Sequence, residues 1–263
     1  MSENYLEVNK ELWNTKTAYH MASEFYDLAG FKAGKSSLNG IELHQLGDIS
    51  GKKLLHLQCH FGQDTLSFAR MGATVTGVDL SDEAIAAATA LAAELQLDAD
   101  FVCCNVLDID KYLIDQTYDI IFTSYGVIGW LPELTKWGQL IHKYLKVGGE
   151  FHIVEFHPAV WMFDDNFEKV SYSYFNKEVI VEEETGTYAD KEAPIVTKSI
   201  TWNHALDEVF KALLDAGLHI ADFKEFDYSP YACFTNEVKV ENGYQIKGFE
   251  GKLPMVYAIK AIK

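Results

Sequence analysis

The residues with the clearest capacity for chemistry lie in the stretch LLHLQCHFGQDTLSFARMGATVTGVDLS, which begins at Leu54. This stretch predicts a short apolar strand, a tight turn that ends at Gly62, a helix, and a second apolar strand that ends at Asp79. Backbone N–H groups at such a helix start can bind a nucleotide, and a carboxylate at the tip of the next strand can accept both hydroxyls of a ribose. Asp79 follows Gln58 by 21 residues, close to the ~20 expected of that acidic residue. We therefore predict the first half of a nucleotide-binding β-α-β unit.

Alternating strand and helix patterns continue along the chain and would place this unit in a mostly parallel sheet. The patterns predict helices over 81–96, 132–146 and 203–216, and strands over 54–57, 75–78, 100–104, 118–122, 150–156, 219–226 and 255–262. Ser81 is a good cap for the first of these helices. The elements therefore predict an α/β protein whose strand ends position the candidate residues.

Two segments do not follow the alternation. Residues 1–50 are rich in aromatic side chains and predict one or two helices, with Val8, Leu12, Thr15 and Tyr19 at helical spacing, that form a lid. Residues 157–200 favour strands or hairpins and predict an insertion, in which Glu182 to Glu184 are a solvated charge run. We therefore expect a single domain over 1–263, made of the lid at 1–50, a nucleotide-binding half at 51–156, the insertion at 157–200 and the second half of the sheet at 201–263.

Composition narrows the class of protein. The chain has 263 residues, 22 Lys and Arg against 39 Asp and Glu, and a net charge of −17, which disfavours nucleic acid and anionic membrane surfaces as partners. The sequence shows no secretory signal and no apolar run long enough to span a membrane. The four cysteines are expected to be reduced. We predict a cytoplasmic protein, a monomer or a homodimer, that acts on a small molecule.

The order of the elements resembles the class I S-adenosylmethionine-dependent methyltransferase fold, over residues 50–156 by motifs and over 203–263 by element pattern. This resemblance implies a seven-stranded Rossmann-like sheet of order 3-2-1-4-5-7-6, with the last strand antiparallel and helices on both faces. The first family motif reads LDLGCGTG; the segment LHLQCHFG keeps Cys59 and Gly62 but has Gln58 and His60 in place of glycines. LHLQCHFGQDT, GVDLS, SYGVIGWLP and EFHP are similar to a subgroup of uncharacterised bacterial methyltransferases.

The resemblance implies S-adenosylmethionine as the cofactor and assigns residues to its adenosine. Asp79 occupies the position that holds the ribose hydroxyls, with Leu80 beside the adenine. Asn105 and Val106 match the position where a side chain and a backbone N–H face the adenine, and the amide oxygen of Asn105 could accept a hydrogen bond from it.

The methionine end of the cofactor is assigned to the first motif and to the loop that follows the fourth strand. Ser124 and Tyr125 in that loop would pass under the methionine and reach toward the methyl acceptor. The remaining predicted cofactor-binding residues are Gln58, Cys59, His60, Gly62, Asp64, Thr65 and Ser81.

Methyl transfer is an in-line displacement, so such an enzyme mainly holds the acceptor ~3 Å from the methyl carbon and excludes water. The acidic surface and the modest insertion favour a small-molecule acceptor, methylated on oxygen or nitrogen rather than carbon. A hydroxyl or protonated nitrogen needs a base. In order of preference the candidates are His157 after the fifth strand, His20 in the lid, with Tyr19 beside it, and His204 at the start of the helix after the insertion.

Other classes of function stay open at this point. His56, Cys59 and His60 lack the spacing and the fourth ligand of a zinc site, so no metal is expected. A nicotinamide- or flavin-dependent oxidoreductase would share the β-α-β unit, but the first turn lacks G-x-G-x-x-G. A non-catalytic S-adenosylmethionine-binding protein would account for the departures in the first motif.

Overall fold

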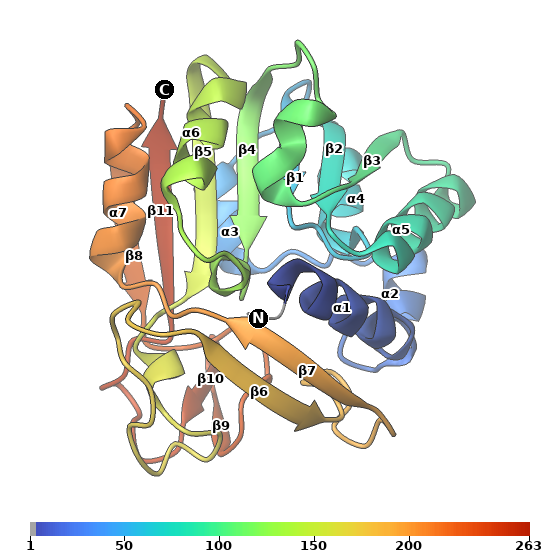
Figure 1. Cartoon of the computed structure of the whole chain (residues 1–263). Coiled ribbons are helices and arrows are strands. Elements are labelled where there is room, and N and C mark those ends of the chain that lie inside the picture. The colour runs from blue at the N-terminus through green and yellow to red at the C-terminus, as the bar shows by residue number, and fades with distance from the viewer. Residues whose placement is uncertain (1–3) are drawn as a thin grey trace.

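A central seven-stranded sheet organises the chain (Figure 1). The computed structural model describes residues 4–263. The strand order is β3-β2-β1-β4-β5-β11-β8, and β11 is antiparallel to both β5 and β8. The strands are β1 (Lys53–Leu57), β2 (Thr74–Asp79), β3 (Ala99–Cys103), β4 (Tyr118–Ser124), β5 (Leu145–Phe156), β8 (His219–Phe226) and β11 (Val256–Ile262). This order, with its antiparallel last strand in sequence, confirms the predicted fold class.

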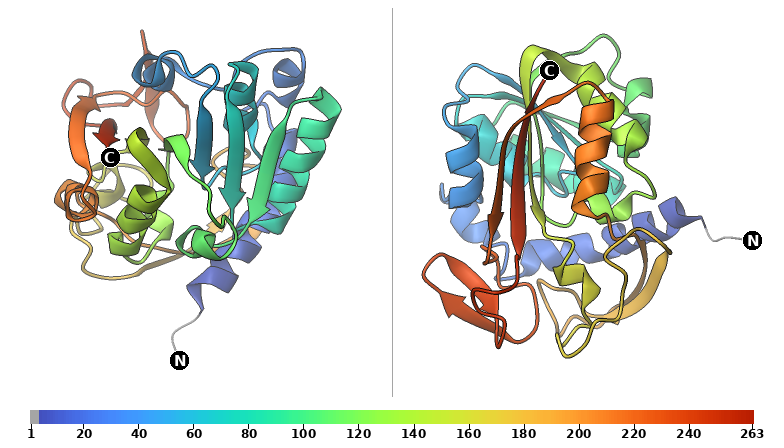
Figure 2. Two further views of the ribbon diagram at one scale, coloured as in Figure 1. Left: turned by 90° about the horizontal axis from the view of Figure 1, so that it is seen from above. Right: turned by 90° about the vertical axis from the view of Figure 1, so that its left-hand side faces the viewer.

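Helices cover both faces of the sheet (Figure 2). On one face, α6 and α7 bury side chains such as Trp137, Tyr144 and Val209 against the strands. On the other face, α3 and α4 contribute Leu46 and Phe68 to a second apolar core. The helices are α1 (Tyr5–Ala22), α2 (Leu28–Lys32), α3 (Gly40–Leu46), α4 (Gln63–Arg70), α5 (Asp82–Leu95), α6 (Thr135–Tyr144) and α7 (Leu206–Asp215), with short 3-10 turns η1 (Val106–Lys111), η2 (Ile128–Trp130) and η3 (Val160–Met162).

The N-terminal helix and the insertion meet at the carboxyl ends of the parallel strands, below the sheet in Figure 1. The insertion forms the hairpin β6 (Ile180–Thr185) and β7 (Val196–Thr201), and a second hairpin, β9 (Glu237–Val240) and β10 (Gly243–Ile246), follows β8. The side-chain amide of Asn9 on α1 donates to the carbonyl of Ile200 at 2.8 Å and accepts from its N–H at 2.9 Å. Through this pair of hydrogen bonds, α1 and the insertion are held together over the same edge of the sheet.

Several boundaries differ from the sequence prediction, most clearly those between α6 and β5. The helix predicted over 132–146 is α6, which begins at Thr135 and ends at Tyr144, and β5 begins at Leu145 rather than at residue 150. The residues before 150 join the sheet because Gly148 donates to the carbonyl of Lys263 at 2.9 Å and Gly149 accepts from its N–H at 3.1 Å. The sheet edge therefore recruits backbone that the local sequence assigns to a helix end.

The N-terminal segment also differs. Its described part, residues 4–50, contains three helices instead of one or two, and of the four residues named at helical spacing only Leu12 is buried. The buried residues of α1 are Asn9, Leu12, Lys16, Thr17 and His20. This face is mostly polar because it packs against a cavity and a hairpin rather than against an apolar core.

Candidate active site

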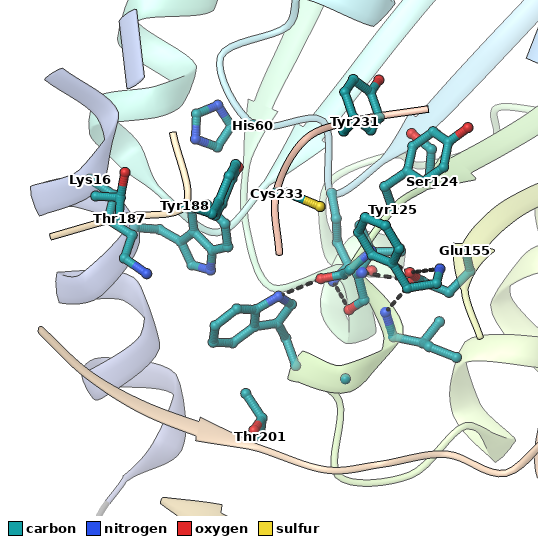
Figure 3. A pocket seen from close by; sticks show the side chains of 18 of the residues that line it. Lys16, His60, Ser124, Tyr125, Glu155, Thr187, Tyr188, Thr201, Tyr231 and Cys233 are labelled. Atoms are coloured by element: carbon teal, nitrogen blue, oxygen red, sulfur yellow. Dashed lines mark hydrogen bonds between the residues drawn. The ribbon is translucent and has the colours of Figure 1, made fainter. Parts of the chain in front are cut away.

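A large cavity of about 1210 Å³ opens at the carboxyl ends of β1, β2, β4 and β5 (Figure 3). Side chains of α1, the hairpin β6–β7 and residues 230–235 line its other walls. Most of the residues predicted to bind a cofactor line this cavity: Gln58, Cys59, His60, Gly62, Asp64, Asp79, Leu80, Asn105, Val106, Ser124 and Tyr125. The sequence prediction therefore located the cavity, although it did not foresee all of its walls.

The turn between β1 and α4 keeps the shape that glycines would permit, yet two of its residues carry side chains. Gln58 has a φ of 55° and His60 a φ of 51°, both in the left-handed region. The side-chain amide of Gln58 donates to the carbonyl of Val127 at 2.8 Å, and the N–H of His60 donates to a carboxylate oxygen of Asp79 at 2.7 Å. These bonds hold the turn against the ends of the neighbouring strands.

Gly62 is required at the end of this turn for two reasons. Its φ of 79° lies in the left-handed region, and a Cβ there would lie 2.8 Å from the ring of Phe101 and 2.9 Å from the Cβ of Ala88. The glycine therefore lets α4 approach the sheet and α5 closely.

Asp79 stands at the carboxyl end of β2 and points into the cavity wall. One carboxylate oxygen accepts from His60 N and the other from Ser81 N at 2.9 Å. Burial raises the pKa of Asp79, and the backbone hydrogen bonds oppose that effect. Each oxygen keeps lone pairs for a further donor, as a ribose site requires.

Thr65 and Ser81 have structural roles in place of the predicted contact with a cofactor. The hydroxyl of Thr65 is buried and lies 2.8 Å from Nδ1 of His56, and Thr65 does not line the cavity. The hydroxyl of Ser81 caps α5 by accepting from Ala84 N at 3.0 Å, and Ser81 is likewise absent from the cavity walls. Both residues satisfy polar groups of the surrounding framework.

Asn105 lines the cavity but uses its amide oxygen locally. This oxygen accepts from Leu107 N at 3.0 Å and so caps η1. The amide therefore presents its NH₂ group as the free donor, whereas the sequence prediction had used the oxygen.

Glu155 near the end of β5 is a buried residue of the site that the sequence analysis missed. Its carboxylate accepts from the N–H groups of Gly126, Val127 and Ile128, the last two at 2.7 and 3.2 Å, and from Phe156 N at 2.7 Å (Figure 3). Burial raises its pKa, and these four donors oppose the shift. Glu155 therefore fixes the loop after β4, and its signal in the sequence is a charge within the apolar run HIVEF.

His20 joins α1 to the turn between β1 and α4, which we call the cofactor turn. Its Nδ1 lies 3.1 Å from Nε2 of His60, the two rings stack with centroids 5.1 Å apart, and Tyr26 stacks on both. Burial lowers the pKa of His20 to about 2 and that of His60 to about 3. His20 itself does not line the cavity, so the structure places it as a support of His60 rather than beside an acceptor.

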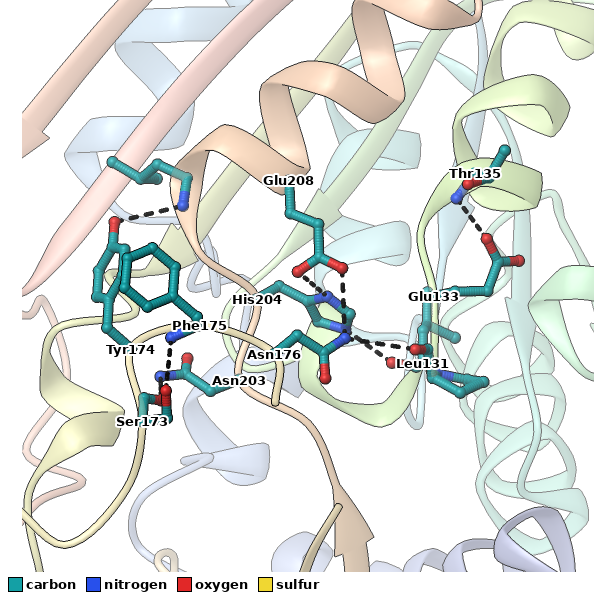
Figure 4. A network of polar contacts seen from close by, with 12 residues as sticks. Leu131, Glu133, Thr135, Ser173, Tyr174, Phe175, Asn176, Asn203, His204 and Glu208 are labelled. Carbon is teal, nitrogen blue, oxygen red and sulfur yellow. Dashed lines mark hydrogen bonds and ion pairs between the residues drawn. The ribbon is translucent and has the colours of Figure 1, made fainter. Parts of the chain in front are cut away.

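His157 and His204 are engaged elsewhere. Nε2 of His157 lies 2.9 Å from the carboxylate of Glu225, its Nδ1 accepts from Ala159 N, and it does not line the cavity. His204 does line the cavity, but one ring nitrogen lies 2.7 Å from the carbonyl of Leu131 and the other 3.1 Å from the Glu208 carboxylate (Figure 4). Neither residue therefore offers a free nitrogen to an acceptor in this structure, contrary to the preference stated from the sequence.

Aromatic side chains from distant segments close the cavity. Tyr26 and Tyr188 share a hydrogen bond between their hydroxyls, Phe25 stacks on Tyr231 at 5.5 Å, and Tyr231 meets Tyr125 edge-on at 5.0 Å. The predicted solvated run also takes part, because Glu182, Glu183 and Glu184 line the cavity. The roof thus combines aromatic rings with carboxylates.

The described residues contain neither a metal-binding group nor a membrane-spanning helix. Within residues 4–263, no group of three or more His, Cys, Asp or Glu side chains is arranged to hold a metal ion. In the same residues, no helix is long and apolar enough to cross a membrane. His56 and Cys59, which prompted the metal question, point to Thr65 and to the space above Gly77 respectively. The four cysteines are free.

Comparisons with known proteins agree with this geometry. A family model described as "Methyltransferase domain" matches residues 54–149. An uncharacterized methyltransferase of Synechocystis is 31% identical over 132 residues, which cover 49% of this chain and 59% of that protein. A ubiquinone biosynthesis O-methyltransferase of Escherichia coli is 35% identical over 134 residues, covering 49% and 55%. The matches thus span less than two thirds of these relatives.

A solved structure extends the likeness to the whole fold. The structure described as a putative S-adenosylmethionine dependent methyltransferase from Listeria monocytogenes has a TM-score of 0.58 at 18% identity, over 89% of this chain and 99% of that one. Together with the domain match over residues 54–149 and the strand order, this likeness shows that the chain has the fold of the class I S-adenosylmethionine-dependent methyltransferases.

Proposed function

We propose that the chain transfers a methyl group from S-adenosylmethionine to oxygen or nitrogen of a small-molecule acceptor. The observation that carries this proposal is the size and position of the cavity. At about 1210 Å³, it exceeds the ~300–1,000 Å³ of a typical small-ligand pocket and so has room for a cofactor and an acceptor together. It runs from Asp79 past Ser124 and Tyr125 to the insertion, as transfer between two adjacent ligands requires.

The residues present fit S-adenosylmethionine. The carboxylate of Asp79 would accept the ribose hydroxyls, and Asn105, with Leu80 and Val106, would border the adenine. The buried side-chain oxygen of Gln58 has no hydrogen-bond partner and would accept from the amino group of the methionine end. When bound, the cofactor supplies an activated methyl group.

The chain's own contribution would be positioning and exclusion of water. Glu155 fixes the backbone of residues 126–128 beneath the reaction centre. The Asn9–Ile200 bonds hold α1 and the hairpin together above it, and Trp13 packs edge-on against Trp130 with ring centroids 5.2 Å apart at the cavity wall. A ligand in this cavity would therefore be held between rigid elements on both sides.

Binding of S-adenosylhomocysteine tests the proposal by isothermal titration calorimetry. Asp79→Ala removes a charged acceptor worth ~1.5–3 kcal/mol, so we expect about a 10- to 100-fold loss of affinity. The matched control is Asp98→Ala, an exposed aspartate before β3, which should bind as the wild type does. Circular dichroism of both variants separates loss of binding from loss of folding.

The outcomes separate the competing functions. Binding of NAD(P) with no binding of S-adenosylhomocysteine would refute the proposal in favour of an oxidoreductase. Binding of S-adenosylhomocysteine without methylation of any compound in a panel of amines, phenols and carboxylates would instead favour a non-catalytic cofactor-binding protein. Small-molecule specificity, the monomeric or dimeric state and the cytoplasmic location stay predictions.

A further inference from the structure

A group of acids and tyrosines borders the cavity beside the loop after β4. It consists of Glu42 on α3, Asp64 in the first turn of α4, Tyr125 and Tyr231, and we call it the acid–tyrosine cluster. Glu42 is fully buried, and Asp64, Tyr125 and Tyr231 line the cavity. The four groups act on one another electrostatically: both carboxylates contribute to raising the pKa values of both tyrosines, and Asp64 contributes to raising that of Glu42.

No cation balances this cluster among the residues described as lining the cavity. The lining residues include three lysines, and each is engaged elsewhere. Lys16 pairs with Glu184 at 3.1 Å, Lys35 with Asp27 at 2.8 Å, and Lys191 donates to a backbone carbonyl. Without a cation, burial favours the protonated form of Glu42, and a ligand that supplies a positive charge would favour the ionised form of Asp64 on the cavity wall.

Buried atoms without a partner point to the same kind of ligand. Oε2 of Glu42 has no hydrogen-bond partner although the residue is fully buried. The side-chain oxygen of Asn203, a cavity residue only 4% exposed, is also unpartnered, because both bonds of that amide are donated by its NH₂ group. Asn203 lines the cavity and its oxygen is a hydrogen-bond acceptor, so a ligand that satisfies it must donate, whereas Glu42 lies behind Tyr125 and does not line the cavity.

Aromatic rings line the cavity beside the cluster. Tyr231 lies between Phe25 and Tyr125, with centroid separations of 5.5 and 5.0 Å. Further along the cavity, Phe156 and Phe234 add apolar rings 5.1 Å apart. Aromatic faces attract a desolvated cation, and the apolar end suits a hydrophobic body attached to it.

We propose that the methyl acceptor is an amine with an apolar body, which binds in its ammonium form against the acid–tyrosine cluster. This proposal rests on the proposed methyltransferase function and narrows it from oxygen or nitrogen to nitrogen. Asp64 is the base, because it is the carboxylate of the cluster that lines the cavity itself, whereas Glu42 does not.

The chemistry balances without a further reactant. The ammonium gives one proton to the Asp64 carboxylate and becomes a neutral amine with a lone pair. That lone pair forms the new carbon–nitrogen bond while the sulfur–carbon bond breaks and its electron pair returns to sulfur. The positive charge thereby moves from sulfur to nitrogen, and the proton on Asp64 leaves to solvent after product release.

Three compounds of matched shape test the charge preference: 2-phenylethylamine, 4-ethylphenol and 3-phenylpropionate. Each is titrated into the complex with S-adenosylhomocysteine in a calorimeter. We expect the amine to bind at least about tenfold more tightly than the other two, a difference of ~1.4 kcal/mol or more. Equal binding of the three, tighter binding of the phenol or the carboxylate, or no binding of the amine would overturn the proposal.

Single substitutions show which side chains are responsible for the binding of the amine. Asp64→Asn should weaken amine binding about tenfold or more and abolish the rise of methylation rate with pH, while Asp165→Asn, which removes a carboxylate elsewhere on the cavity wall, should do neither. Tyr231→Phe keeps the ring and should retain most of the amine affinity. An Asp64→Asn variant that binds and methylates the amine as the wild type does would refute the role of Asp64.

A second comparison separates the acceptor's charge from that of the cofactor. S-adenosylmethionine carries a sulfonium charge and S-adenosylhomocysteine does not. A change in the ratio of their dissociation constants therefore shows whether the acid–tyrosine cluster interacts with the sulfonium. We expect Asp64→Asn to leave that ratio unchanged. A selective loss of S-adenosylmethionine affinity would show that the cluster serves the sulfonium and would overturn the amine proposal. Failure of the wild type to bind either compound would instead refute the methyltransferase function.

Discussion

The buried carboxyl of Glu42 should make the stability of the protein depend on pH in a way that a single substitution removes. Glu42 is fully buried on α3, where one oxygen accepts from the side chain of Asn39 at 3.3 Å and the other has no partner. Burial, with a smaller contribution from the charge of Asp64, raises its pKa to about 7 from an ordinary value of 4.5. Glu42→Gln keeps the shape of the neutral acid and cannot ionise.

The sign and size of this pH dependence follow from the difference between the pKa of Glu42 in the folded state and in the unfolded state. Because the folded state holds the proton more tightly than the unfolded state, the stabilisation from protonated Glu42 is complete below about pH 4.5 and is lost as the pH rises through about 7. The full difference is ~3 kcal/mol at 1.36 kcal/mol per pKa unit, and ~2 kcal/mol of it falls between about pH 5.5 and 9. Glu42→Gln should therefore gain ~2 kcal/mol relative to the wild type across that interval.

Urea unfolding of the ligand-free protein, followed by tryptophan fluorescence and circular dichroism at several pH values, measures this difference. Comparing each variant with the wild type at the same pH removes the contributions of other titrating groups. Glu11→Gln, on the exposed side of α1, is the control and should track the wild type throughout. If the difference between Glu42→Gln and the wild type stays constant from about pH 5.5 to 9, the argument that Glu42 is a neutral buried acid is wrong.

Two further predictions concern the turn between β1 and α4 and the contact of α1 with the hairpin. Gly62→Ala should lower the free energy of unfolding by ~2–4 kcal/mol, because its φ is positive and the new Cβ would press on Phe101. The control Gly248→Ala, at a positive φ in open space, should lower it by only ~1 kcal/mol. Equal losses of the two variants in urea unfolding would contradict the steric argument. Asn9→Ala removes both side-chain bonds to the backbone of Ile200, so hydrogen exchange at that N–H should accelerate about tenfold or more, and unchanged protection would show that α1 does not hold the hairpin.

The sheet and its strand ends were predictable because they depend on local patterns. Apolar runs of strand length, separated by helical periods, place Asp79, Asn105 and Ser124 at or after the ends of β2, β3 and β4. In a parallel sheet these ends meet at one edge, so residues far apart in sequence converge without any further information. The structure brings all three to the walls of one cavity.

The acceptor side was less predictable because contacts over long sequence separations build it. β5 ends at Phe156, after which the N–H of His157 donates to Met255 at 2.9 Å and the side chain turns toward Glu225 on β8. No local pattern reveals that pairing. Likewise, the polar buried face of α1 makes sense only once the hairpin with Ile200 is known to lie against Asn9.

Residues with a strained backbone are concentrated at the cavity. Among the described residues, eight other than glycine have a positive φ, and five of these line the cavity: Asp27, Gln58, His60, Tyr125 and Phe167. A left-handed conformation costs a non-glycine residue ~1–2 kcal/mol, so neighbouring interactions must hold each of them in place. At His60 these are the bond to the carboxylate at the tip of β2 and the ring stack from α1. A glycine would adopt the same turn at a lower cost but could not reach α1. The His60 side chain, which replaces a glycine of the first motif, therefore does what a glycine cannot, because it joins α1 to the turn on which the cofactor would rest.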